Sequence, residues 1–233
     1  MIGVLGGMGP LATADFLRKL VAATPAERDQ DHVPVLVYSL PQIPERVPAI
    51  LGDGESPLPA MRAGVDVLVR AGAHCVAMAC NTAYHWFDAL VAACPVPILH
   101  IADAAVAELG DARRIGLVAT AGTLHSGFYQ QRLAAAAREI VLPDAAVEQE
   151  LILPGIRLVK EARLREAGAL FARALVDLHA RGAERVILAC TEVPVGLAAV
   201  DSDPGTIAVD ATDSLARACV AWWRTATNGS ARA

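Results

Sequence analysis

Two cysteine motifs, one in each half of the chain, constrain the fold more than any other feature. Ala79-Cys80-Asn81-Thr82 follows an apolar run at 74–78, and Ala189-Cys190-Thr191-Glu192 follows a second apolar run at 185–188. Short apolar runs of this kind are typical of buried strands, and each leads into a helical pattern. Because ligands bind where the loops after parallel strands converge, the two thiols predict a site with two chemically similar walls.

The segments far upstream of these motifs also repeat. Ile115-Gly116 opens an apolar run that echoes the run opened by Ile2-Gly3, and the spacing between these pairs nearly equals the spacing from Cys80 to Cys190. Nearly equal spacings indicate two similar halves. Since apolar strands alternate with helical patterns throughout, we expect an α/β fold with mainly parallel sheets.

Composition limits the classes of partner. The chain has 233 residues, of which 55% are hydrophobic and 19% charged, and its formal net charge is −5. This balance favours a well-buried protein and, with scattered basic residues, argues against nucleic acid or a membrane as partner. The start of the chain has no signal-peptide pattern and no apolar stretch is long enough to span a bilayer, so we expect a cytoplasmic protein. The five cysteines lack the spacing of metal sites, and we expect reduced thiols and no metal.

A glycine-rich turn is a candidate anion cradle. Ile2–Leu5 is predicted as a strand, and Gly6-Gly7-Met8-Gly9-Pro10 carries it into a helix near Leu11. A helix amino terminus can hold an anion, although a simple tight turn explains the glycines equally well. The turn lacks GxGxxG and the P-loop lysine, and no ribose-binding acid follows the next strand at 35–38. We therefore disfavour a nucleotide, and favour a carboxylate over a phosphate as the anion.

Two basic residues are candidates for holding that carboxylate. Arg46 stands in the stretch 41–48, whose three prolines predict a stiff loop without regular helix. Its planar guanidinium matches a carboxylate bidentately. Lys160 ends an irregular helical stretch, 146–160, that we expect to break at Pro154-Gly155. From the residues alone, a solvated surface position is the ordinary alternative for both.

Two opposed thiols can invert a carbon centre. One, as thiolate, removes a proton from carbon, and the other, as thiol, returns a proton to the opposite face. Hydrogen-bond donors would stabilise the carbanion, and the Met8-Gly9 turn, Asn81, Thr82 and Thr191 could supply them. Buried structural cysteines are the alternative. A cysteine hydrolase would need an oriented base beside Cys80, and no partner that orients His85 is evident.

The remaining patterns complete the predicted halves. Val96–Leu99 predicts a fourth strand, Thr206–Val209 a last strand and Ala211–Trp223 a last helix, with a disordered tail at 228–233. Glu192 could act as an acid or base, cap a helix, or orient a thiol or the substrate amine.

The chain resembles the aspartate/glutamate racemases over nearly its whole length. The motifs that carry the resemblance are Gly6-Gly7-Met8-Gly9-Pro10, Pro41-Gln42-Ile43-Pro44-Glu45-Arg46, Cys80-Asn81-Thr82-Ala83, Ala119-Thr120-Ala121-Gly122-Thr123, Ile156-Arg157-Leu158-Val159-Lys160 and Cys190-Thr191-Glu192. The resemblance implies two α/β domains related by pseudo-twofold symmetry, with a cofactor-independent active site in the cleft between them. We expect residues 1–100 with 211–233 in one domain, residues 101–210 in the other, and a homodimer.

The resemblance also assigns roles within that cleft. Cys80 and Cys190 become the acid and base for the two faces of an acidic amino acid, aspartate or glutamate. Arg46 and Lys160 are expected to hold its side-chain carboxylate, which reverses the ordinary reading of both. The residues expected around the α-carboxylate and α-amine are Asn81, Thr82, Thr120, Thr123 and Thr191. Met8, Gly9 and Glu192 are further residues expected to bind the substrate.

The sequence departs from the family pattern at two places. Tyr84 stands where a histidine is usual, and Glu45-Arg46-Val47 loses a hydroxyl from the loop. These changes bear on substrate choice more than on reaction type. Hydantoin racemases, maleate isomerases and arylmalonate decarboxylases share the scaffold and remain alternatives, as does a silent binding protein for acidic amino acids.

Overall fold

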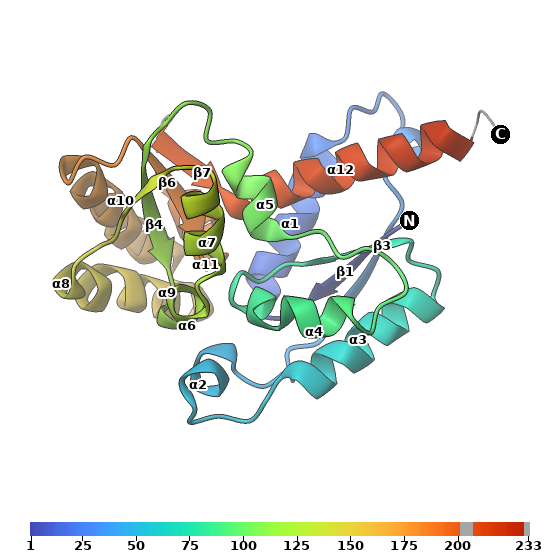
Figure 1. Ribbon diagram of the computed structural model, residues 1–233, viewed down its shortest axis with the longest axis horizontal. Coiled ribbons are helices and arrows are strands. Elements are labelled where there is room, and N and C mark those ends of the chain that lie inside the picture. The colour runs from blue at the N-terminus through green and yellow to red at the C-terminus, as the bar shows by residue number, and fades with distance from the viewer. Residues whose placement is uncertain (201–206, 231–233) are drawn as a thin grey trace.

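Two parallel sheets organise the chain. The computed structural model describes residues 1–200 and 207–230, with side chains as far as residue 226. Figure 1 shows the two lobes, one around the sheet of order β2-β1-β3 and one around the sheet of order β5-β4-β6-β7. Every strand pairing is parallel. The strands are β1 (Ile2–Gly6), β2 (Val35–Ser39), β3 (Cys75–Met78), β4 (Arg114–Ala119), β5 (Glu139–Val141), β6 (Arg185–Ala189) and β7 (Ala208–Asp210).

Helical segments follow nearly every strand, as parallel connections require. In the first half they are α1 (Pro10–Ala23), η1 (Asp29–Asp31), α2 (Arg46–Leu51), α3 (Leu58–Arg70), η2 (Thr82–Trp86), α4 (Phe87–Val91) and α5 (Ile101–Val106). In the second half they are α6 (Ala121–Ser126), α7 (Phe128–Ala135), α8 (Ala145–Val147), η3 (Glu148–Ile152), α9 (Leu153–Lys160), α10 (Leu164–Ala180), α11 (Glu192–Leu197) and α12 (Ala211–Ser230). The α/β class predicted from the sequence is confirmed.

The same strand register occurs in both sheets. In the first sheet Leu5 of β1 lies opposite Met78 of β3, and in the second Val118 of β4 lies opposite Leu188 of β6. Met78 and Leu188 each stand two residues before their cysteine. The two cysteine motifs therefore leave their sheets at equivalent positions, as the repeated spacings in the sequence predict.

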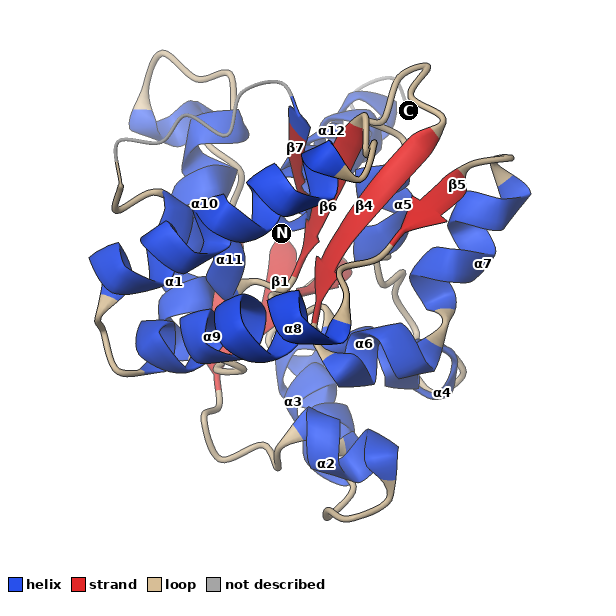
Figure 2. Ribbon diagram, turned by 90° about the vertical axis from the view of Figure 1, so that its left-hand side faces the viewer, coloured by secondary structure: helices blue, strands red, loops and turns tan. Residues whose placement is uncertain are grey.

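The second sheet has a different core on each face. Ile115, Leu117 and Ile187 point into a buried cluster that also contains residues of α12 and of β1 and β3 in the other lobe. The opposite face, with Val118 and Leu188, packs against α9, α10 and α11. Figure 2 shows β4, β6 and β7 with helices on both sides. One continuous core therefore joins the two lobes.

The last helix ties the end of the chain back to its beginning. α12 packs against α1 and α5 (Figure 1). Lys19 of α1 is only 5% exposed. Its Nζ lies 2.6 Å from Asp210 Oδ2 and donates to Thr212 Oγ1 at 2.9 Å, and it also pairs with Asp15. Because α12 packs against helices on both sides of residue 100, this packing does not decide the division at residues 100 and 210, which stays a proposal.

The proline-rich stretch 41–48 is a loop, as predicted, only as far as Glu45, and its end is helical. α2 begins at Arg46 and includes Pro48. Proline is tolerated there because the first turn of a helix does not use its N–H groups. Likewise the chain does not break at Pro154-Gly155, since Pro154 lies in the first turn of α9, directly after the π-helical segment η3.

The predicted strand at 96–99 is reduced to one bridge. Ile98 bridges to Val76, and the flanking hydrogen bonds run from Val76 N to Pro97 O and from Leu99 N to Val76 O. Pro95 and Pro97 lack N–H donors, so the segment cannot extend into a regular ladder.

The end of the chain also differs from expectation. α12 extends to Ser230, so the first part of the predicted disordered tail is helical, while residues 231–233 lie outside the described residues. The predicted last strand forms at 208–210, and Thr206 lies outside the described residues. Over the described ranges, we find no helix with the length and apolar character needed to cross a membrane.

Candidate active site

The glycine-rich turn is built for close approach of two backbones. Gly7 has φ +90°, and a Cβ there would lie 2.4 Å from the backbone of Leu40. The Gly7 N–H donates to Thr13 Oγ1 at 2.8 Å, and that hydroxyl donates to Gly9 O at 2.8 Å. The Gly7 N–H is therefore committed to α1 instead of being free for an anion, and the turn contributes the neighbouring Met8 to the site.

A small cavity of about 110 Å³ lies between the lobes and has both thiols in its wall. It is lined by Met8, Glu45, Arg46, Val47, Pro48, Cys80, Asn81, Thr82, Thr120, Ile156, Lys160, Cys190, Thr191 and Glu192. The structure thus brings together the predicted thiols, cations and hydroxyls from separate segments of chain. Of the predicted residues, Gly9 and Thr123 do not line it.

Cys190 is hydrogen-bonded to a carboxylate. It stands directly after β6 and is 3% exposed. Its Sγ donates to Glu192 Oε2 at 3.1 Å, and Thr191 Oγ1 donates to the same oxygen at 3.1 Å. Burial raises the pKa of the Cys190 thiol well above its usual range, and the negative charge of Glu192 raises it further.

Cys80 lies in the same cavity wall as a cation, Arg46. It follows β3 and is 5% exposed. Burial raises the pKa of the Cys80 thiol, while the guanidinium of Arg46 acts in the opposite direction by stabilising the thiolate. Glu192 is a further, weaker influence that raises this pKa. The two sulfurs thus share one cavity with neighbours of opposite charge.

Arg46 is held rigidly by backbone carbonyls. Its Nη1 donates to Ile43 O at 3.2 Å and Pro44 O at 3.0 Å, and its Nη2 donates to Met8 O at 3.3 Å. Its Nε is buried without a hydrogen-bond partner. Because an unpaired buried donor is costly, this N–H is a candidate for holding an anion in the cavity.

Three threonine hydroxyls join the lobes beside the cavity. Thr82 Oγ1 lies 3.0 Å from both Thr120 Oγ1 and Thr123 Oγ1, and Thr120 Oγ1 donates to Thr123 Oγ1 at 3.0 Å. Thr120 also caps α6 by accepting from Thr123 N at 3.2 Å. Thr123 therefore supports the other two from behind, while Thr82 and Thr120 reach the cavity wall.

Asn81 presents a free donor to the cavity. Its Oδ1 accepts from the hydroxyl of Tyr129 at 2.6 Å, and its Nδ2 is buried without a hydrogen-bond partner. The tyrosine bond fixes the amide so that Nδ2 stays available for an oxygen of a ligand. The sequence does not predict Tyr129 as a site residue, because its position within α7 carries no local signal.

Lys160 is paired at the mouth of the cavity. Its Nζ lies 3.7 Å from Glu45 Oε1, with side-chain exposures of 59% and 73%. The cavity lining therefore contains two cations, Arg46 and Lys160, and two carboxylates, Glu45 and Glu192. The sequence identifies Glu45 only as a departure from the family pattern, and its pairing with Lys160 depends on the tertiary fold, which brings the residue before α2 close to the last residue of α9.

Tyr84 and His85, which stand where the sequence departs from the family pattern, do not line the cavity. The hydroxyl of Tyr84 donates to Leu99 O at 2.9 Å and accepts from Met78 N at 3.3 Å, so it braces β3 from behind. His85 Nδ1 lies 2.9 Å from Ser126 Oγ, which in turn donates to Gly122 O at 2.7 Å. Nothing in this arrangement makes His85 the base of a cysteine hydrolase.

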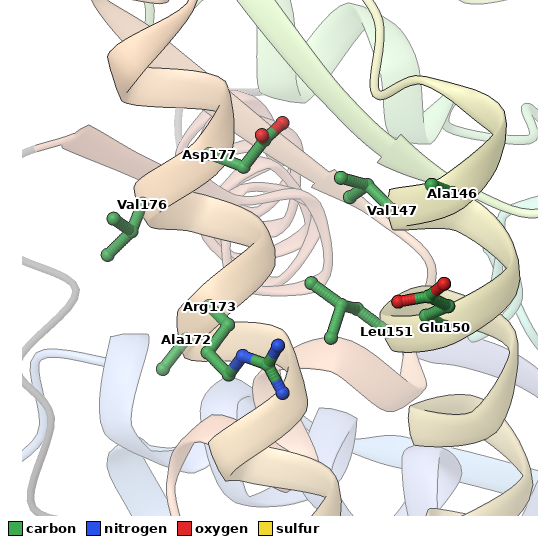
Figure 3. Close-up of a pocket in the computed structure, with 8 residues that line it drawn as sticks. All are labelled: Ala146, Val147, Glu150, Leu151, Ala172, Arg173, Val176 and Asp177. Atoms are coloured by element: carbon green, nitrogen blue, oxygen red, sulfur yellow. The ribbon is translucent and has the colours of Figure 1, made fainter.

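A larger hollow lies elsewhere on the second lobe. It has a volume of about 560 Å³ between the α8–η3 segment and α10, and Val147 and Leu151 point across it (Figure 3). The other residues in its wall are Ala146, Glu150, Ala172, Arg173, Val176 and Asp177. It contains neither a thiol nor a hydroxyl, so the small cavity is the candidate active site. Within residues 1–200 and 207–230, we find no cluster of His, Cys, Asp and Glu that could hold a metal ion.

Known proteins resemble this chain along both lobes. A sequence model of the Asp/Glu/Hydantoin racemase family matches residues 5–219. The broad specificity amino-acid racemase RacX of Bacillus subtilis (strain 168) is 27% identical over 225 residues, which cover 94% of this chain and 96% of the relative.

Solved structures share the architecture. Picrophilus torridus aspartate racemase superposes with a TM-score of 0.83 at 32% identity, covering 94% of this chain and 91% of that chain. Glutamate racemase from Francisella tularensis subsp. tularensis SCHU S4, solved with D-glutamate, gives a TM-score of 0.71 at 16% identity, covering 97% of this chain and 81% of that chain. The second likeness concerns the fold alone.

Proposed function

Because this chain belongs to the Asp/Glu/hydantoin racemase family, we propose that it racemises a small acidic amino acid by proton transfer between two cysteines. Amino-acid racemase activity follows from the family and its relatives. The substrate and the two-thiol mechanism are our proposal. The observation that carries it is that Cys80 and Cys190, from equivalent ends of two sheets, share one small cavity.

The chemistry balances with the side chains present. The thiolate of one cysteine takes the proton from Cα, so the Cα–H bond breaks, an S–H bond forms and the electron pair spreads into the α-carboxylate. The thiol of the other cysteine then gives its proton to the opposite face of Cα and becomes the thiolate. The centre is inverted, and the two sulfurs have exchanged their protonation states. No other electron acceptor is needed in this scheme.

Several donors can stabilise the carbanion. Asn81 and the threonines Thr82, Thr120 and Thr191 line the same cavity as the thiols. Asn81 Nδ2 has no hydrogen-bond partner, so it can stabilise charge that develops on the α-carboxylate without reorganising. Thr120 and Thr191 would first have to turn their O–H groups away from Thr123 and Glu192. We propose that these groups hold the α-carboxylate, with Glu192 and Met8 at the α-amine.

Cavity size and charge favour an acidic substrate over a bulky one. A volume of about 110 Å³ is well below the roughly 300–1,000 Å³ of sites for drug-sized ligands, which disfavours large hydantoins. Arg46 and Lys160 remain our candidates for a side-chain carboxylate. That carboxylate would have to compete with Glu45 for Lys160. The homodimer, the cytoplasmic location and the independence from a cofactor remain predictions.

The test is incubation of the purified chain with single enantiomers of aspartate and glutamate, without pyridoxal phosphate. Chiral chromatography should show inversion of at least one of them in both directions. A protein that is thermally stabilised by an acidic amino acid but does not invert it would instead be a binding protein. Neither inversion nor binding with any acidic amino acid would contradict the proposed substrate class.

A further inference from the structure

The two thiols have different surroundings. The Cys190 S–H donates to Glu192 Oε2 at 3.1 Å, whereas Cys80 shares the cavity wall with Arg46, whose positive charge lowers the pKa of that thiol. Both thiols are almost fully buried, so water does little to screen these neighbours. A carboxylate that accepts from S–H stabilises the thiol, and a cation stabilises the thiolate.

The other charged groups of the cavity do not cancel this difference. Glu45 and Lys160 lie 3.7 Å from each other at the exposed mouth, where their opposite charges offset one another and solvent screens both. Glu192 raises the pKa of both thiols, but of the two it is hydrogen-bonded only to Cys190. The asymmetry therefore depends on Arg46 from α2 and Glu192 from α11.

We propose that Glu192 is a positioning residue that keeps the proton on Cys190, so that Cys80 ionises first and the free enzyme enters the reaction with its base at Cys80 and its acid at Cys190. This inference rests on the proposed function, because it assigns the starting roles of the two thiols in that reaction. Thr191 supports the arrangement by donating to the same carboxylate oxygen at 3.1 Å.

The arrangement makes the two half-reactions unequal in their starting states. After one inversion Cys80 holds a proton, and Cys190 is a thiolate beside the carboxylate of Glu192. Two adjacent negative charges in a buried site disfavour this form. The enzyme returns to its starting form either by converting the opposite enantiomer or by taking a proton from water onto Cys190 and losing one from Cys80.

The experiment measures each thiol separately and does not depend on turnover. The wild-type protein is alkylated with iodoacetamide across a range of pH, and mass spectrometry of peptides gives the rate at each cysteine. Because accessibility scales the rate but not its midpoint, the midpoint of each pH profile reports the ionisation of that thiol. We expect the Cys80 midpoint to lie at least about one pH unit below that of Cys190, a ten-fold difference in ionisation.

Changing the carboxylate should move Cys190 most. Glu192→Gln removes the charge and should lower the Cys190 midpoint by about one pH unit or more, with a smaller fall at Cys80. Glu192→Asp keeps the charge but withdraws it from the sulfur, so its effect should be smaller and in the same direction. Glu45→Gln removes a carboxylate from the same cavity without contact to a thiol and should move neither midpoint.

Three outcomes would overturn the inference: a Cys190 midpoint at or below that of Cys80 in the wild type, no fall in either Glu192 variant, or an equal fall with Glu45→Gln. Racemisation of the wild type, assayed in parallel, judges the proposed function independently. If inversion occurs without the difference in midpoints, only this inference fails. If the midpoints differ but no inversion occurs, the proposed function fails instead.

Discussion

The two walls of the cavity share the same backbone arrangement but differ in the residues that surround each cysteine. Leu5 opposite Met78 and Val118 opposite Leu188 place both cysteines at the same point beyond their sheets. After Cys80 the chain continues into the 3₁₀ segment η2, and after Cys190 into α11, which carries Glu192. The repeated fold therefore fixes where the sulfurs lie, while the residues around them decide which sulfur holds the proton.

Replacing either cysteine should have the largest effect. Cys80→Ser and Cys190→Ser should each reduce racemisation by about 10³-fold or more, because each removes the acid or base for one face. Each variant should still exchange the Cα proton of one enantiomer with deuterated water, and the two variants should act on opposite enantiomers. Chiral chromatography with mass spectrometry checks both points. A variant that still converts both enantiomers at a near wild-type rate would contradict the claim that each cysteine serves one face of Cα.

Arg46→Gln should remove the feature that favours the Cys80 thiolate. Since Arg46 opposes the rise that burial causes in the pKa of Cys80, its loss should raise that pKa and move the acidic limb of kcat/KM to higher pH. At neutral pH we expect a loss of about ten- to hundred-fold, because the thiolate fraction falls about ten-fold for each pH unit by which the pKa rises. Arg46→Lys keeps the charge and should move the limb less. An unchanged acidic limb in Arg46→Gln would show that Arg46 does not tune Cys80.

Lys160→Ala should affect binding more than chemistry. If Lys160 holds the side-chain carboxylate, its loss should raise KM for the acidic substrate by about ten-fold with little change in kcat, since charged hydrogen bonds contribute about 1.5–3 kcal/mol and Lys160 is well exposed. Steady-state kinetics in both directions measures this. An unchanged KM would remove Lys160 from the binding set.

Glu45→Gln should act in the opposite direction. Freeing Lys160 from an exposed ion pair, worth up to about 1 kcal/mol, should lower KM by about two- to five-fold. The same steady-state kinetics measures this change. A raised KM would mean that Glu45 contributes to binding itself instead of competing with the substrate.

Thr123→Val should have the smallest effect. Thr123 is buried behind Thr82 and Thr120, which remain hydrogen-bonded to each other without it. We expect a loss of about 1 kcal/mol in the free energy of unfolding, measured with urea, and a near wild-type KM. Thr120→Val, which changes the cavity wall itself, is the matched comparison and should raise KM. A larger rise in KM for Thr123→Val than for Thr120→Val would mean that Thr123 contacts the substrate directly.

The sequence predicts the main strands and the positions of the two cysteines better than it predicts the segments that contain proline. The runs that become β1, β3, β4 and β6 are apolar enough to be read as buried strands, and both cysteine motifs follow them directly. Local patterns are less informative where proline occurs. Pro48 lies inside α2, because it occupies a first turn, and the run at 96–99 forms only a bridge, because its prolines lack donors.

Among the site residues, those that lie in motifs are predicted from the sequence, whereas their hydrogen-bond and ion-pair partners are not. Motifs identify most of the cavity wall, since they mark the loops that meet at the edge of each sheet. The partners of those residues come from elsewhere in the chain and carry no local signal. Tyr129 behind Asn81, Glu45 opposite Lys160 and the commitment of the Gly7 N–H to Thr13 all depend on how distant elements pack.

The most direct test of two opposed thiols is the isotope content of both enantiomers early in the reaction. The wild-type protein is given one enantiomer in deuterated water, and the reaction is stopped after a few per cent conversion. Two thiols on opposite faces predict that the product carries one deuterium at Cα while the recovered substrate carries none. Equal labelling of substrate and product, or a product that keeps its original hydrogen, would mean that a single base serves both faces and would contradict the account.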